Sequence, residues 1–203
     1  MDIYKPFGPS IGKIRLPDEL IFYLNNEFSD KAPVHTGFLK EKASEIDFSS
    51  EVQNKVVTAL LSPIAHYHLE HHPEDKDEKL AVICHKGWYV RQFDNEYVPA
   101  HVHPNCKLSC VGYLKLPEGI EEEFEKDEKT ISPRSARIEF LYGDASMTYC
   151  TYSHVIKPKV GDFYIFPSGL LHTVYPFKTR GERRAFSMNL SVGINAEIVS
   201  TND

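Results

Sequence analysis

GDFYIFPSGLLH, at residues 161–172, joins a short apolar run to a turn and a histidine. The apolar and aromatic residues at 162–166 are typical of a buried β-strand. The Pro-Ser-Gly sequence at 167–169 is typical of a turn. Because the run is shorter than an ordinary helix and is bounded by turn residues, it indicates β structure. His172, just past this strand, is a candidate functional side chain.

Similar runs recur from residue 79 onward and alternate with turn residues. No long helical pattern separates them, which argues against parallel βαβ units. We therefore expect a mainly β fold with N-terminal helices, of the antiparallel sandwich or jelly-roll type. The charged stretch 118–129 is predicted to be a solvated loop. The strand candidates are residues 80–84, 88–93, 108–116, 136–142, 147–156, 162–166 and 184–192.

Two helical patterns precede the β region. Pro17 and the two acidic residues after it start a helix whose apolar residues recur at helical spacing to residue 24. Residues 49–51 open a second helix with an apolar stripe at 56–61. Pro63 is expected to interrupt this second helix early, with the segment ending near residue 68.

Composition and charge restrict the class of protein. The chain is 41% hydrophobic and 26% charged, as in ordinary globular proteins. Its length suits one domain over 1–203, with helical N-terminal support over 1–78 and an antiparallel β core over 79–197. The net charge of −6 argues against a nucleic-acid partner.

The sequence shows little sign of a signal peptide, a membrane span or a cysteine framework. The first fifteen residues do not resemble a signal peptide, and no apolar run approaches the roughly 20 residues that span a bilayer. The four cysteines lack the spacing of a disulfide framework or a zinc ribbon. We therefore expect a cytoplasmic protein with reduced thiols and no membrane partner.

Three of the ten histidines stand apart. His101 and His103 are separated by one residue, and alternate residues of a strand point to the same face, so both can reach one metal. Pro99 and Pro104 flank them and favour an extended segment. With His172 they form a three-imidazole set suited to iron, zinc, copper or nickel.

The other histidines are expected to be bystanders. Four of them lie at 66–72, in a polar segment that runs into Pro73, which indicates a solvated helix end. The remaining three are isolated and are interpreted as surface or core residues; they are His35, His85 and His154.

Alternation along the last strand candidate separates two faces. Arg184 shares its face with apolar residues at 186, 188, 190 and 192, which can pack on a second layer. Arg183 shares the other face with small polar residues such as Ser187 and Asn189, which is typical of a solvated ligand pocket. Arg183, rather than Arg184, is therefore the cation expected to face a pocket.

Taken together, these motifs resemble the iron(II)/2-oxoglutarate oxygenases of phages and marine bacteria, which are related to the prolyl 4-hydroxylases. The resemblance covers residues 88–192 well and the N-terminal third loosely. It implies a double-stranded β-helix with N-terminal helices. It also implies an enzyme that uses iron(II), 2-oxoglutarate and O2 to insert one oxygen atom into a C–H bond, with release of succinate and CO2. The stretches that carry it are Trp88, 101–105, Ser109, 113–114, 161–163, 166–168, 172–174, Pro176, 182–183, Ser187 and Asn189, with residues 7–11 similar to the family's start.

The resemblance implies a role for each ligand. His101 and His103 stand at the paired metal-ligand positions, and His172 stands at the distal histidine position. Most members of the wider superfamily have Asp where this chain has His103. Three neutral imidazoles would leave the metal more positive than two imidazoles and a carboxylate would.

The same resemblance places the cosubstrate. Arg183 stands where the C5 carboxylate of 2-oxoglutarate is held, and a guanidinium suits a planar carboxylate. Ser187 and Tyr113 are candidate hydroxyl donors to the same group. The usual Arg-x-Ser pairing is altered, because Ala185 comes two residues after Arg183 and Ser187 comes four after it.

Three alternatives stay open. The spacing from Gly161 through 167–169 to His172 also matches the second cupin motif, although Pro176 stands where that motif has Asn. The first cupin motif expects Glu where residues 107–108 are Lys and Leu. The chain could thus be a cupin-type metal enzyme or binding module that does not use 2-oxoglutarate. Three histidines plus water also suit a zinc enzyme, and a non-catalytic jelly roll is the third alternative.

The sequence does not name the substrate. We expect a small-molecule or peptidyl substrate, with prolyl hydroxylation suggested by kinship alone. Residues 30–48, 92–100 and 117–135 are predicted to be the specificity loops. A homodimer is compatible with the sequence.

Overall fold

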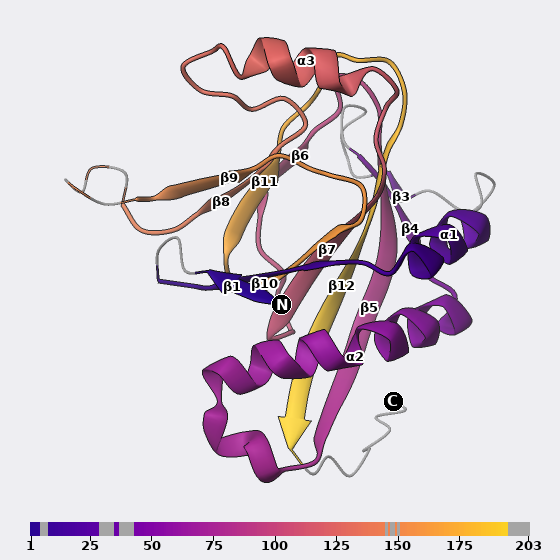
Figure 1. The fold of residues 1–203 in the computed structure, drawn as a ribbon, viewed down its shortest axis with the longest axis vertical. Coiled ribbons are helices and arrows are strands. Elements are labelled where there is room, and N and C mark those ends of the chain that lie inside the picture. The colour runs from indigo at the N-terminus through magenta and orange to yellow at the C-terminus, as the bar shows by residue number, and fades with distance from the viewer. Residues whose placement is uncertain are drawn as a thin grey trace.

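Two antiparallel β-sheets face each other in the computed structural model, which describes residues 1–4, 8–28, 35–36, 43–144, 146, 149 and 151–194 (Figure 1). The larger sheet consists of β1 (Asp2–Tyr4), β2 (Ile11–Arg15), β10 (Asp162–Pro167), β7 (Leu108–Lys115), β12 (Arg183–Ile194), β5 (Leu80–Gln92), β4 (Ser44–Asp47) and β3 (His35–Thr36), in that spatial order. The smaller sheet consists of β6 (Val98–His101), β11 (Leu171–Val174), β8 (Ile138–Leu141) and β9 (Ser153–Ile156). The predicted antiparallel jelly-roll class is confirmed.

The core between the sheets is aromatic. Phe166 and Tyr164 of β10 meet Phe140 of β8, and the Phe140 and Phe166 rings pack edge to face with centroids 4.8 Å apart. All three side chains are almost fully buried. Because side chains alternate along each strand, the opposite face of the larger sheet is free to pack on helices.

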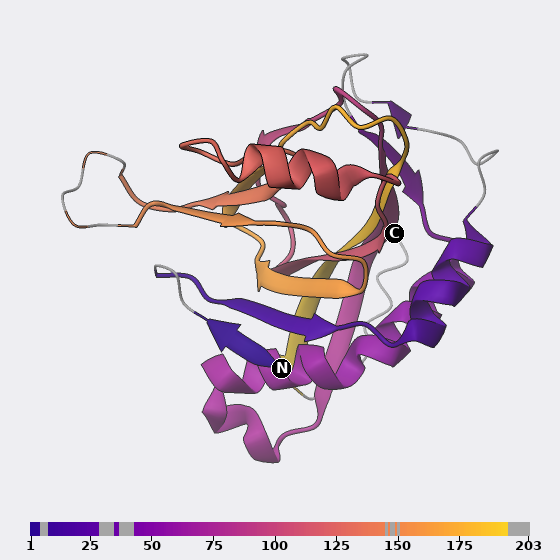
Figure 2. The same cartoon turned by 45° about the horizontal axis from the view of Figure 1, so that its top comes forward.

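Two helices cover that outer face (Figure 2). They are α1 (Asp18–Glu27) and α2 (Ser50–His71), and the short 3₁₀ helix η1 (Pro73–Asp77) follows them. Ser49 caps α2 by accepting a hydrogen bond from the Val52 amide. None of the helices in the described residues has the length and apolar character needed to span a bilayer.

The expected early interruption at Pro63 is wrong, because α2 continues unbroken to His71. Pro63 removes one helical hydrogen bond, which costs about 3 kcal/mol in an isolated helix. However, Ile64 and Tyr67 extend the buried stripe beyond Pro63, with 0% and 3% exposure. Packing of these side chains against the larger sheet offsets the lost hydrogen bond.

The solvated loop predicted at 118–129 is also wrong, because α3 (Ile120–Asp127) forms there, at the end of the molecule opposite α2 in Figure 1. Ile120 and Phe124, four residues apart, pack together with Ala136 and Phe177. The Glu123 carboxylate accepts hydrogen bonds from the Lys178 and Thr179 amides. The high charge of the segment concealed a helix with one apolar face.

The strands also differ in detail from their predicted bounds. β5 is one continuous strand where two were predicted, and Gly87 lies within it because Phe48 occupies the space a Cβ would need. Strands β1 to β4 come from the N-terminal third and extend the larger sheet. The sequence analysis did not predict these four strands. The candidate at 147–156 is observed as β9, and several of its first residues lie outside the described part of the chain.

Replacing Phe124 with alanine is expected to lower the free energy of unfolding by about 3 kcal/mol, because it leaves a cavity among the apolar side chains that α3 packs against. Phe124 is 1% exposed and packs beneath Arg137 and Lys157. The measurement is urea unfolding followed by circular dichroism. Glu125→Ala, on the exposed side of the same helix, should change stability by less than about 0.5 kcal/mol. Equal effects of the two substitutions would show that α3 is not packed as described.

Candidate metal centre

The three histidines singled out from the sequence come together at one point. His101 is the last residue of β6, and β11 pairs with β6 so that His172 lies directly opposite His101. One ring nitrogen from each of His101, His103 and His172 lies within 4.8 Å of the others. The Nε2 atoms of His103 and His172 are 3.3 Å apart. This spacing is short enough for one metal ion to bind all three nitrogens.

His103 reaches the cluster by a route different from the one predicted. Strand β6 ends at His101, so His103 lies in the turn that follows and not on the same strand. The His103 amide donates to the Ser168 carbonyl oxygen at 2.9 Å, and the Ser168 hydroxyl donates to the Cys106 carbonyl oxygen at 2.6 Å. The two turns, one after β6 and one after β10, therefore hold each other and place His103.

Backbone carbonyls fix the orientation of two rings. The Nδ1 atom of His101 is 2.7 Å from the Pro99 oxygen, and that of His172 is 2.8 Å from the Leu170 oxygen. A carbonyl oxygen only accepts hydrogen bonds, so each Nδ1 carries the proton. The Nε2 lone pairs are then free for a metal, which is the arrangement that orients ligand histidines in metalloproteins.

Burial keeps His103 and His172 neutral. Desolvation, with a smaller contribution from the neighbouring His101, lowers the pKa of His172 to about 3 and that of His103 to about 4. A neutral imidazole has the free lone pair that a metal needs. At neutral pH these two histidines can therefore bind a divalent cation without first losing a proton.

The cluster lines one side of a cavity of about 480 Å³ between the two sheets. Trp88 lies beside His103, with ring centroids 5.7 Å apart, and its indole nitrogen is buried with no partner among the described residues. Arg183 and Ser187 line the same cavity. A cavity of this size accommodates a small ligand together with part of a second one.

The alternation predicted for the last strand is observed in β12. Arg183 is 1% exposed and lines the cavity with Ala185. Arg184 points to the opposite side, where its guanidinium forms ion-pair contacts with Glu182 and lies 3.5 Å from the centre of the Phe28 ring. The two neighbouring arginines therefore occupy different environments.

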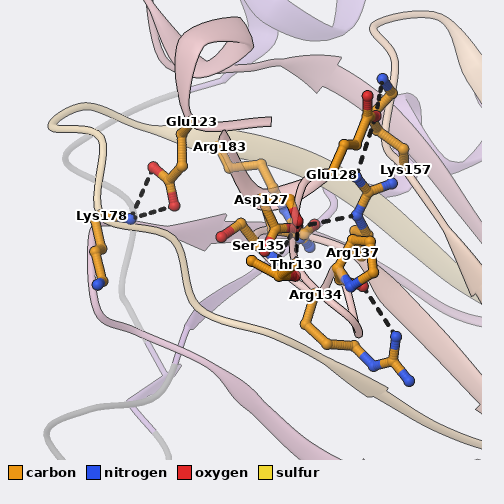
Figure 3. A network of polar contacts seen from close by, with 12 residues as sticks. Glu123, Asp127, Glu128, Thr130, Arg134, Ser135, Arg137, Lys157, Lys178 and Arg183 are labelled. Atoms are coloured by element: carbon orange, nitrogen blue, oxygen red, sulfur yellow. Dashed lines mark hydrogen bonds and ion pairs between the residues drawn. The ribbon is translucent and has the colours of Figure 1, made fainter. Parts of the chain in front are cut away.

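No carboxylate in the described part of the chain pairs with Arg183. Its Nη1 donates to the Ala136 carbonyl oxygen at 2.9 Å, its Nε has no partner among those residues, and burial lowers its pKa. Figure 3 shows the loop that presents this carbonyl. In that loop the Ser135 amide donates to Asp127, and Arg137 contacts the same carboxylate at 3.5 Å. Ala136 itself has a positive φ of 54°, unusual for a residue with a Cβ.

Tyr113 completes the surroundings of this arginine. The Arg183 guanidinium carbon lies 5.6 Å from the centre of the Tyr113 ring. The Tyr113 hydroxyl is buried and has no partner among the described residues. Burial raises the pKa of Tyr113 to about 12, so the hydroxyl keeps its proton and can donate to an anion.

The bystander histidines at 66–72 lie in α2 and just after it. His68 contacts Asp75 at 2.8 Å and is less solvated than predicted, whereas His71 is exposed, as expected of a solvated helix end, although its ring hydrogen-bonds Ser10. His72 contacts Glu74 in an exposed position. Across the described residues, the group formed by His101, His103 and His172 is the one set of three side chains placed to hold a metal.

Sequence reasoning missed Glu45 as a residue of this site, because residues 30–48 were expected to be a loop. Glu45 lies in β4 and lines the cavity. The alternation of charged Glu45 and Asp47 around buried Ile46 was the signal that could have identified the strand.

Comparison with known proteins gives three results. Residues 86–189 match the sequence model of a family described as "Putative 2OG-Fe(II) oxygenase". No curated protein sequence matches the chain. Several solved structures are similar, and at their levels of identity the similarity shows the fold.

Three of these structures illustrate the range of sequence identity and structural similarity. The viral collagen prolyl hydroxylase of Paramecium Bursaria Chlorella virus-1, in its 2OG complex, is 18% identical with a TM-score of 0.56 over 89% of this chain and 94% of that one. A Pseudomonas putida prolyl-4-hydroxylase is 13% identical with a TM-score of 0.56 over 89% and 91%. HygX from Streptomyces hygroscopicus, with nickel and 2-oxoglutarate bound, is 10% identical with a TM-score of 0.60 over 89% and 82%.

Proposed function

The chain belongs to the 2OG-Fe(II) oxygenase family, and from this membership we propose which residues carry the activity. His101, His103 and His172 hold iron(II), and Arg183 holds the carboxylate of 2-oxoglutarate that lies far from the metal. When bound together, iron, O2 and 2-oxoglutarate supply the oxidising power to insert an oxygen atom into a C–H bond, with release of succinate and CO2. The protein is thus a non-heme iron dioxygenase that acts as a hydroxylase.

The observation that carries this assignment is the buried guanidinium of Arg183. A buried charge without an opposite charge is costly, and such groups are normally paired. Arg183 has one backbone acceptor and no carboxylate partner in the described residues, yet it lines the same cavity as the three histidines. A dicarboxylate that spans the cavity would satisfy the arginine and reach the metal. The cupin and zinc alternatives give no reason for this unpaired cation.

The hydroxyl groups nearby fit the same ligand. We assign Tyr113 and Ser187 as donors to the carboxylate held by Arg183, because the first is buried without a partner and the second lines the cavity. Hydrogen bonds from neutral donors to a carboxylate add to a guanidinium pair without adding charge. Closely packed aromatic side chains around the cavity, such as Phe166 and Trp88, keep bulk water from the histidines.

The substrate is a small molecule or a peptide. Two of the similar structures are prolyl hydroxylases and another was solved with hygromycin B, so the shared fold does not select between the two classes. Cys84, Cys106 and Cys110 are free thiols, which suits the cytoplasmic location we propose. A homodimer stays a prediction.

Anaerobic titration tests the proposed function. Addition of 2-oxoglutarate to the iron(II)-loaded protein is expected to produce the weak visible band of an iron–2-oxoglutarate chelate, and O2 should then release succinate. Zinc loading should give neither the band nor succinate and serves as the control. Iron that binds at one equivalent without any response to 2-oxoglutarate would favour the cupin alternative.

A further inference from the structure

Two side chains of opposite charge line the cavity, and they differ in exposure. Arg183 is 1% exposed, whereas the Glu45 side chain is 46% exposed. Glu45 therefore lies at the open end of the cavity and Arg183 at its closed end. Under the proposed function the charge of Arg183 is neutralised by 2-oxoglutarate. The carboxylate of Glu45 then remains as the acidic group that an incoming substrate meets.

The strand register explains why Glu45 faces inward. Glu45 pairs with Val90 of β5, and both side chains line the cavity. The next residue, Ile46, points to the opposite side, where it is 3% exposed in the core beneath the helices. Because alternation fixes these directions, the inward position of Glu45 does not depend on a flexible side-chain choice.

One cation of the protein already lies at this end. The Lys86 ammonium is 3.1 Å from Asp47 and 3.8 Å from Glu45, and it sits 5.2 Å from the centre of the Trp88 ring. Asp47 holds this lysine more closely than Glu45 does. Among the described residues, two carboxylates therefore surround one ammonium at the opening, and Glu45 is the more distant of the two.

Much of the cavity wall is apolar. Val90, Val98, Pro99 and Ala100 line the same cavity as Glu45 and the histidines, and Trp88 and Tyr97 contribute aromatic surface. An aliphatic chain suits such a wall. A cation suits a carboxylate next to aromatic rings.

We propose that the substrate of this enzyme carries a protonated amine or guanidinium on an aliphatic chain, and that Glu45 binds this cation. The proposal rests on the proposed function, which assigns the other end of the cavity to 2-oxoglutarate. A substrate held at Glu45 by its charge presents its carbon chain to the histidine cluster. The net charge of −6 of the chain further favours the approach of a cation.

The test uses a reporter that the protein already contains. Trp88 is the single tryptophan of the chain, and it lines the cavity, so its fluorescence reports ligands that bind there, and the titrations with and without 2-oxoglutarate separate the probe from the cosubstrate. The zinc-loaded protein, which does not turn over, is titrated with Nα-acetyl-lysinamide and with Nα-acetyl-norleucinamide, with and without 2-oxoglutarate. The two probes share the aliphatic chain and differ in the ammonium group.

We expect the lysine probe to bind about 5- to 10-fold more tightly than the norleucine probe, as for a part-exposed ion pair supported by an aromatic ring. Glu45→Gln should remove this preference. Lys86→Met should increase it, because the competing internal cation is lost. Glu19→Gln, on the exposed side of α1, makes the same charge change outside the cavity and should leave the preference unchanged.

Equal affinities of the two probes for the wild-type protein, or a preference that survives in Glu45→Gln, would overturn the proposal. A parallel titration with n-pentylamine separates the sources of the cation. Tighter binding of the lysinamide indicates a peptidyl substrate, and tighter binding of the free amine indicates a small molecule. Loss of the 2-oxoglutarate response while the lysine preference persists would count against the proposed function and not against the role of Glu45.

Discussion

Replacement of His172 with alanine is expected to abolish stoichiometric metal binding. His172 is 4% exposed, and its Nε2 lies 3.3 Å from that of His103. Loss of a group that only hydrogen-bonds a metal ligand already lowers metal affinity by about 10–100-fold. Loss of one of the three ligands themselves should lower it by more than about 100-fold. The measurement is the metal content of protein loaded with one equivalent of iron(II) and passed through a desalting column.

Two further variants make this result specific. His68→Ala removes a histidine of α2 that contacts Asp75, and it should retain full metal content. His103→Asp supplies the carboxylate that most members of the superfamily have, and it should also retain the metal. The melting temperature of each metal-free variant, followed by circular dichroism, shows that the protein is folded. Full metal content in folded His172→Ala would move the site elsewhere, with the histidines at 66–72 as the next candidates.

Replacement of Arg183 with alanine is expected to weaken 2-oxoglutarate binding by roughly 30-fold or more while leaving the metal in place. The change removes a charge-assisted pair from a desolvated site, which costs on the order of 2–5 kcal/mol. Arg183 lies on β12, and its side chain hydrogen-bonds Ala136 and no histidine among the described residues, so its loss should leave the metal ligands in place. The measurement is the quenching of Trp88 fluorescence by 2-oxoglutarate in protein loaded with the same metal.

The neighbouring arginine supplies the matched control. Arg184→Ala makes the same chemical change on the opposite side of the strand, where the guanidinium contacts Glu182 and Phe28. It should lower stability but leave 2-oxoglutarate affinity within about threefold. Arg183→Lys should recover part of the lost affinity, because a point charge cannot reproduce the planar guanidinium. Equal affinities for wild type, Arg183→Ala and Arg184→Ala would exclude the proposed role of Arg183.

Local alternation is the property that the sequence revealed most reliably. The different sides taken by Arg183 and Arg184 follow from the two-residue period of a strand, which holds whatever the strand packs against. The antiparallel class could be predicted for a related reason, since turn residues and short apolar runs are local signals. The grouping of His101 and His103 was predicted because two residues so near in sequence stay near in space.

Several features depended on which distant segments meet. His103 is placed by the Ser168 carbonyl, which belongs to a turn 65 residues away in the chain. Helix α3 is stabilised by Phe177, which lies outside the segment that looked like a charged loop. Helix α2 passes through Pro63 because the sheet beneath it buries Ile64. None of these contacts has a local signature.

By itself, the sequence determined the strand-rich class, the three histidines and the side of β12 on which Arg183 lies, because each depends on backbone geometry within a few residues. Tertiary structure alone decided that Arg183 has no carboxylate partner in the described residues, that Ala136 supplies its one backbone acceptor, and that Glu45 lies at the open end of the same cavity. Burial and pairing of a charge depend on every segment that surrounds it. Such surroundings are set by the packing of the two sheets and not by the residues next to it in the chain.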